Sequence, residues 1–146
     1  DMETIEAALT IAETGHLTFG TLHTSDAVQS INRMVDVFPS HQQQQVRTQL
    51  SFVIQAVFCQ QLLPMARGSG RALALEIMIA NSAVRALIRD DKAHQIYSII
   101  QTGGRRGMQT MNHSLSELVR RNHITVDMAL SHTSDQDDLQ RILGRA

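Results

Sequence analysis

The sequence predicts an α/β fold, and three observations carry this prediction. Near the N-terminus, the spacing of apolar residues predicts a helix, a strand and a second helix, with connections of one to three residues between them. A β-hairpin pattern follows at about residues 61–79, and from residue 81 onward only short helical patterns occur. Short connections of this kind are typical of a parallel sheet covered by helices. We therefore expect a sheet-bearing part over residues 1–80 and an all-helical part over residues 81–146.

The first three elements follow from spacing and from helix-ending residues. Residues 3–14 place their apolar side chains on one helical stripe, and Gly15 is a natural stop for that helix. Residues 16–23 are rich in strand-forming side chains and are predicted as a strand. Ser25 or Asp26 can cap the helix that follows, because either side chain can accept a hydrogen bond from a backbone N–H of the first turn.

A third helix is expected to begin after a proline. Ser40 with Gln43 three residues later forms a capping-box pattern. The apolar spacing continues through Val57, so Cys59 is predicted as a small buried residue at the end of this helix.

The rest of the chain divides into a hairpin and a set of helices. Extended segments at 61–64 and 71–79 flank a Gly-Ser-Gly loop, and large and small residues alternate in the second segment, which should be half-buried. The expected helices are 83–91, 93–101, 110–121, 126–130 with Thr125 as its cap, and one that starts at Ser134.

Composition limits the function classes. Hydrophobic residues make up 42% of the chain, enough to fold a core. A net charge of −1 argues against a nucleic-acid partner, and the single cysteine suits a cytoplasmic location. The sequence contains no apolar run near the roughly 20 residues that span a bilayer. Because the chain begins inside a helix-start pattern without Met, we interpret it as a fragment of a longer protein.

The stretch GHLTFGTLHT at 15–24 is the strongest candidate site. His23 and Thr24 lie at the carboxyl end of the predicted strand, where α/β sheets bind ligands. An imidazole there can donate to a phosphate oxygen, and a hydroxyl can order a water. His16 would lie at the other end and on the opposite face, where a neighbouring subunit or a backbone carbonyl could be its partner. A purely structural role for both histidines stays open.

Metal binding and nucleophilic catalysis are not expected. On one strand the Cα atoms of His16 and His23 would be roughly 23 Å apart, too far to share a metal. The other histidines lack ligand spacing. The chain also lacks a GxSxG elbow and the GxxxxGK[ST] loop that cradles phosphates.

Several motifs together identify a family. The run TGHLTFGTLHT at 14–24 resembles the His box of the secretion and type IV pilus ATPase superfamily, and residues 1–4 resemble the tail of its Walker B element. Further runs resemble the pilus retraction motors of this superfamily: NRMVDVFP at 32–39, QLSFV at 49–53, QQLLP at 60–64 and GMQTMN at 107–112.

The resemblance implies a RecA-like P-loop ATPase core, of which residues 1–80 would be the second half, followed by a helical C-terminal subdomain. The parent protein would be a hexameric motor that hydrolyses ATP with Mg²⁺ and retracts a pilus, giving twitching motility. It would act in the cytoplasm at the inner face of the inner membrane, against a pilus platform protein. His23 would be the catalytic residue near the γ-phosphate, His23 and Thr24 would bind nucleotide, and His16 would support an interface.

The family also has a retraction motif, AIRNLIRE, which resembles residues 83–90. Here an alanine, Ala86, replaces its asparagine and an aspartate replaces its glutamate. The residues that match or nearly match are Arg85, Leu87, Ile88, Arg89 and Asp90.

Two other functions remain possible at this point. The parent protein could be an extension, secretion or accessory ATPase of the same superfamily. The chain could also be a non-enzymatic module that docks to the pilus platform. In either case we expect residues 1–146 alone to be inactive, since the phosphate loop and the Walker B glutamate are missing, and to be prone to aggregate through an exposed apolar face.

Overall fold

The computed structural model describes residues 1–144 and combines ten α-helical or strand elements with two short 3₁₀ turns. In chain order these are α1 (Met2–Glu13), α2 (Ala27–Asp36), α3 (Ser40–Val53), β1 (Ala56–Pro64), β2 (Arg71–Ile79), α4 (Ser82–Arg89), η1 (Ala93–Gln95), α5 (Ile96–Thr102), η2 (Gly104–Arg106), α6 (Met111–Arg120), α7 (Val126–Ser131) and α8 (Gln136–Leu143). The mixture of helices and sheet agrees with the predicted α/β class.

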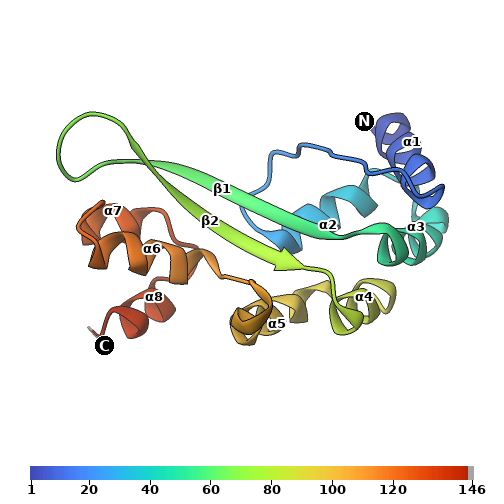
Figure 1. Cartoon of the computed structure of the whole chain (residues 1–146). Coiled ribbons are helices and arrows are strands. Elements are labelled where there is room, and N and C mark those ends of the chain that lie inside the picture. Colours follow the sequence, from blue (N-terminus) through green and yellow to red (C-terminus); the bar gives the residue numbers. More distant parts are fainter. Residues whose placement is uncertain (145–146) are drawn as a thin grey trace.

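The hairpin of β1 and β2 is the long axis of the molecule (Figure 1). Helices α6, α7 and α8 lie along the half near its loop, whereas α1, α3 and α4 gather at the opposite end (Figure 1). The strands pair antiparallel with Ala56 opposite Ile79 and Pro64 opposite Arg71. The second strand begins and ends where the sequence predicts it, and the first begins five residues earlier.

The second strand is half-buried as predicted, and the first two residues of its buried face are small alanines. Along β2 the inward residues are Ala72, Ala74, Glu76 and Met78. Leu73, on the other face, is 47% exposed. The small alanines allow close packing of α6, which is the helix in contact with this part of β2.

The predicted strand over residues 16–23 is wrong. These residues form an irregular segment, which Figure 1 shows as a loop between α1 and α2. The described residues hold one sheet, of two antiparallel strands, so this part of the chain has no parallel sheet. A strand needs a neighbour to pair its backbone groups, and here none lies beside it. Leu17 and Phe19 are consequently 78% and 88% exposed.

The helix starts agree with the predictions in most places. Asp26 and Thr125 cap α2 and α7 by accepting from the backbone N–H three residues on. The capping box at Ser40 is wrong: Ser40 is the first residue of α3, no side chain caps this helix, and Gln43 donates instead to the carbonyl of Phe38.

The third helix also ends earlier than predicted. It stops at Val53 because Ile54 adopts an extended conformation, and Val57 and Cys59 belong to β1. Cys59 is buried as expected, but in a strand.

Two hydrophobic clusters fill the interior. The first cluster contains residues of the five helices α1 through α5 and of the end of the hairpin away from its loop. In it Ile31, Ile88 and Ile96 are at most 2% exposed. The second joins the loop half of the hairpin to α6, α7 and α8 around Leu63, Leu115 and Leu139. Both clusters contain residues from each side of residue 80, so the division at 80 stays a prediction. None of the helices described here has both the length and the apolar character needed to cross a bilayer.

A polar network joins α5, α6 and α8 beside the second cluster. Asp138 is 8% exposed and accepts hydrogen bonds from Asn112 Nδ2 at 2.8 Å and from the Tyr97 hydroxyl at 3.2 Å, and it also pairs with Arg141. Burial alone would raise the pKa of Asp138, but these donors outweigh it and leave the pKa below its usual value.

Tyr97 provides a direct test of this packing. Burial, followed by the charge of Asp138 and the hydrogen bond to it, raises the pKa of Tyr97 to about 12. Tyr97 is the single tyrosine of the chain, so tyrosinate absorbance should titrate with a midpoint near that value, and Asp138→Asn should lower the midpoint.

The sign for stability follows from the raised pKa. Because the folded state keeps the phenol protonated, this group's contribution to stability is complete below the ordinary tyrosine pKa of 10.0 and is lost as pH rises through about 12. A midpoint near 10 in a chain that retains its circular dichroism would contradict the burial of Tyr97.

Candidate functional site

The His-box segment lies between α1 and α2, and both of its histidines are exposed. The ring Nδ1 of His16 lies 2.8 Å from the hydroxyl of Thr14, the residue that ends α1. His23 precedes the N-terminus of α2 by four residues. Since the segment is irregular, the strand-based distance and opposite faces predicted for the two rings have no support here. Their different surroundings still assign them to different helix ends.

Thr24 is tied to the first turns of α2. Its hydroxyl lies 2.7 Å from that of Ser30, which also donates to the carbonyl of Asp26 and lies 3.6 Å from Cys59 Sγ. Ser30 is 3% exposed, and Thr24 is half-buried. The position of Thr24, and of His23 beside it, therefore depends on how the start of α2 is held.

Glu76 holds the start of α2. Its carboxylate accepts a hydrogen bond from the backbone N–H of Ala27 at 2.8 Å and a longer one, 3.4 Å, from that of Met111. These are the first residues of α2 and α6, so one side chain serves two helix N-termini. Each N-terminus offers unpaired N–H groups and a partial positive charge, and both favour a carboxylate.

The pKa of Glu76 is raised above its ordinary value. Burial is the largest cause, the N–H groups of Ala27 and Met111 oppose it, and the charge of Asp26 adds to it. The sequence motifs did not single out Glu76. A carboxylate on the inward face of an alternating strand, between Ala74 and Met78, is the signal that could have found it.

The GMQTMN run attaches α6 to β2. Gly107 has a φ of +79°, a conformation that favours glycine. Gln109 exchanges backbone hydrogen bonds of 2.8 and 3.0 Å with Ile77, and its side chain donates to the carbonyl of Leu75. Thr110 caps α6, and Ser114 accepts from the N–H of Leu75 at 3.0 Å. In this chain the motif attaches the C-terminal helices to β2.

The segment that resembles the retraction motif, residues 83–90, lies in α4 and its C-terminal cap, and its two arginines have different surroundings. Arg85 Nη1 donates to the carbonyls of Ser51 and Phe52, both at 2.7 Å, and so binds the C-terminal end of α3. Ile88 is buried and Leu87 half-buried. The Arg89 side chain is 45% exposed, and its Nε lies 3.6 Å from the carboxylate of Asp90.

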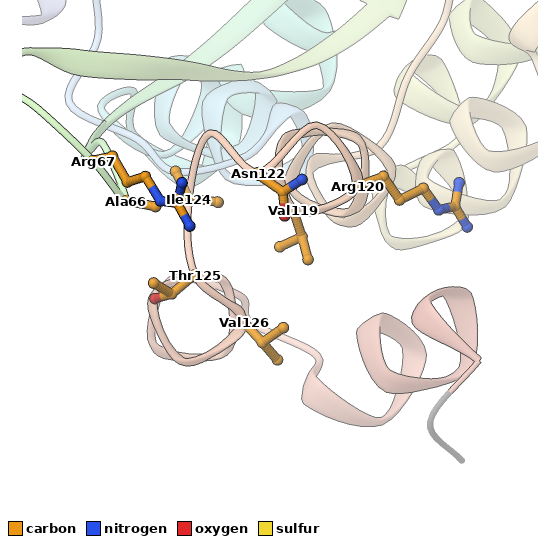
Figure 2. Close-up of a pocket in the computed structure, with 8 residues that line it drawn as sticks. All are labelled: Ala66, Arg67, Val119, Arg120, Asn122, Ile124, Thr125 and Val126. Atoms are coloured by element: carbon orange, nitrogen blue, oxygen red, sulfur yellow. The ribbon is translucent and has the colours of Figure 1, made fainter.

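A shallow pocket of about 540 Å³ lies between the hairpin loop and the start of α7 (Figure 2). Its polar groups do not converge: Arg120 points away from Arg67 in Figure 2, and its guanidinium is engaged with Glu117 and the carbonyl of Ile142. Within residues 1–144, no group of three or more His, Cys, Asp or Glu could hold a metal ion. The His-box segment with the start of α2 remains the candidate site.

Comparison with known proteins first defines the class. The family model described as "Type II/IV secretion system protein" matches residues 1–141, so the chain belongs to this family.

The similar proteins include pilus retraction motors. The chain is 52% identical over 129 residues to the type IV pilus retraction ATPase PilT of Pseudomonas aeruginosa, covering 88% of this chain and 37% of that protein. It is 49% identical over 139 residues to a twitching motility protein of Neisseria gonorrhoeae, covering 95% and 37%.

A crystal structure of the pilus retraction motor PilT with bound ADP has a similar fold. The TM-score is 0.86 at 48% identity, over 97% of this chain and 39% of that one. This likeness confirms the predicted fold class, part of the α/β core of an ATPase of this family. The chain spans less than half the length of the relatives it matches.

The contacts of Arg85 and Arg89 predict different effects of substitution. Arg85→Ala removes a charged donor from two carbonyls at the end of α3 and should lower the free energy of unfolding by about 1.5–3 kcal/mol. Arg89→Ala, at an exposed position, should change it by about 0.5 kcal/mol or less. Denaturant unfolding of the two variants measures the difference. Equal losses would show that Arg85 does not stabilise α3.

Proposed function

We propose that the whole protein to which this chain belongs hydrolyses ATP and uses the energy to retract a type IV pilus, which produces twitching motility. One observation carries the proposal: 52% identity to a pilus retraction ATPase over 88% of this chain. The fold likeness to a retraction motor that binds ADP supports it.

Within this reaction the chain supplies one wall of the nucleotide site. His23 acts at the γ-phosphate of ATP, and Thr24 beside it binds the nucleotide. The tie of Thr24 to Ser30 supports this assignment, because it holds the Thr24 hydroxyl, and the histidine beside it, against the start of a packed helix. The phosphate grip and the Mg²⁺ ligands come mainly from residues outside these 146, since the sequence has no GxxxxGK[ST] loop.

The working assembly in this proposal is a homohexamer. It acts in the cytoplasm, at the inner face of the inner membrane, against a pilus platform protein. His16 serves an interface between subunits, and its exposed position supports this role. In the retraction motif, Arg85, Leu87 and Ile88 hold α4 in place, whereas the exposed Arg89 and Asp90 act in retraction.

His23→Ala in the full-length protein should lower ATP turnover by about 10²-fold, the scale of losing one donor to transition-state charge, with the hexamer intact. His41→Ala is the matched control, because His41 is an exposed histidine on α3. Steady-state ATPase assays and size-exclusion chromatography measure both. Turnover that is unchanged in His23→Ala would remove His23 from the mechanism.

Residues 1–146 alone should show no ATP turnover, because a phosphate grip is missing from the sequence. They should also associate, since Phe19, Phe58 and Leu62 are 88%, 61% and 57% exposed. ATPase assay and light scattering of the purified chain test this. Turnover that persists after repurification would mean that the site is complete in this chain. A monodisperse, inactive chain that binds the pilus platform would favour the non-enzymatic module instead.

A further inference from the structure

Glu76 is a buried carboxylate that the proposed chemistry does not use. It is 3% exposed and lies directly opposite Cys59 in the hairpin register. Ionised groups in such places are costly unless they are paired. Here the two partners are backbone N–H groups of different helices, so the carboxylate fixes the relative position of two elements that are distant in sequence.

The two helices lead to different parts of the molecule. Helix α2 begins at Ala27, three residues after Thr24, and Ser30 within it contacts the Thr24 hydroxyl. Helix α6 begins the C-terminal group of helices, which pack around their own hydrophobic cluster. A change at the start of either helix must therefore act on Glu76, and through it on the other.

We propose that Glu76 is a positioning residue that holds the starts of α2 and α6 together and thereby keeps His23 and Thr24 aligned for ATP hydrolysis. The inference rests on the proposed ATPase function. It makes the C-terminal helices a support of the nucleotide site, through a buried side chain that acts on the site only by way of α2. The same contact would allow movement of those helices to reach the site.

Glu76→Gln in the full-length protein tests the proposal. Glutamine has the same size, but its amide can accept only through one oxygen, so one of the two helix starts is released. We expect kcat for ATP to fall roughly ten- to a hundredfold with KM within about twofold, because misalignment affects the transition state more than binding.

Ser114→Ala is the matched control. Ser114 ties α6 to β2 through the N–H of Leu75 and has no hydrogen bond to α2. Its loss removes a tie between α6 and β2 that lies outside the Glu76 contact and leaves the starts of both helices bound to Glu76, so kcat should stay within about twofold of wild type. Both variants are compared at equal hexamer content and with their denaturant midpoints measured.

Ser30→Ala serves if Glu76→Gln does not assemble. It frees the Thr24 hydroxyl from α2 and should lower kcat several-fold at unchanged KM. Unchanged kcat in Ser30→Ala, or in an assembled Glu76→Gln, overturns the inference while wild-type turnover stands. Equal kcat losses in Glu76→Gln and Ser114→Ala overturn it too, since that result assigns both residues to stability alone. A full-length wild type without ATPase activity overturns the proposed function itself.

Discussion

The arrangement of this chain depends on one carboxylate between two helix N-termini. A helix start leaves backbone N–H groups without partners, and burying such groups unpaired costs about 1–3 kcal/mol each. A buried carboxylate without donors costs several kcal/mol more. Glu76, Ala27 and Met111 resolve both problems in one contact. Because the solution requires all three groups, α2 and α6 are fixed relative to β2 and so to each other.

The two faces of the hairpin determine how the helices are arranged around the Glu76 contact. Its inward face carries two alanines, Ala72 and Ala74, so α6 can approach β2, and Gln109 forms backbone hydrogen bonds with Ile77. Its outward face carries Phe58, Leu62 and Leu73, all more than 45% exposed. An uncovered face of this kind on a two-stranded sheet is marginal by itself, because three or more strands or a covering helix are usually needed. The fold therefore depends on the helices on the inner side, and the outer side is exposed in this chain.

Several local features could be predicted from the sequence because their causes are local. Asp26 and Thr125 cap helices through residues three positions away, and the alternation in β2 is visible in nine residues. The strand at 16–23 was wrong because strand formation depends on a neighbouring strand, which a propensity pattern does not contain. Glu76 reaches a backbone group 49 residues away and Arg85 one 34 residues away. Contacts at such separations have no periodic signal, so their roles required the structure.

The loss of the predicted strand changes the argument about the two histidines. An odd spacing separates side chains only when the backbone alternates, so it cannot assign His16 and His23 to different faces of an irregular segment. Their separation now follows from their attachments: Thr14 at the end of α1 contacts the His16 ring, whereas Thr24 ties the His23 end to Ser30 in α2. Since Glu76 fixes the start of α2, the His23 end is attached through buried polar contacts, whereas the His16 ring contacts an exposed hydroxyl at the end of α1. This difference suits the proposed roles, in which His23 must be aligned with the nucleotide and His16 contacts another subunit.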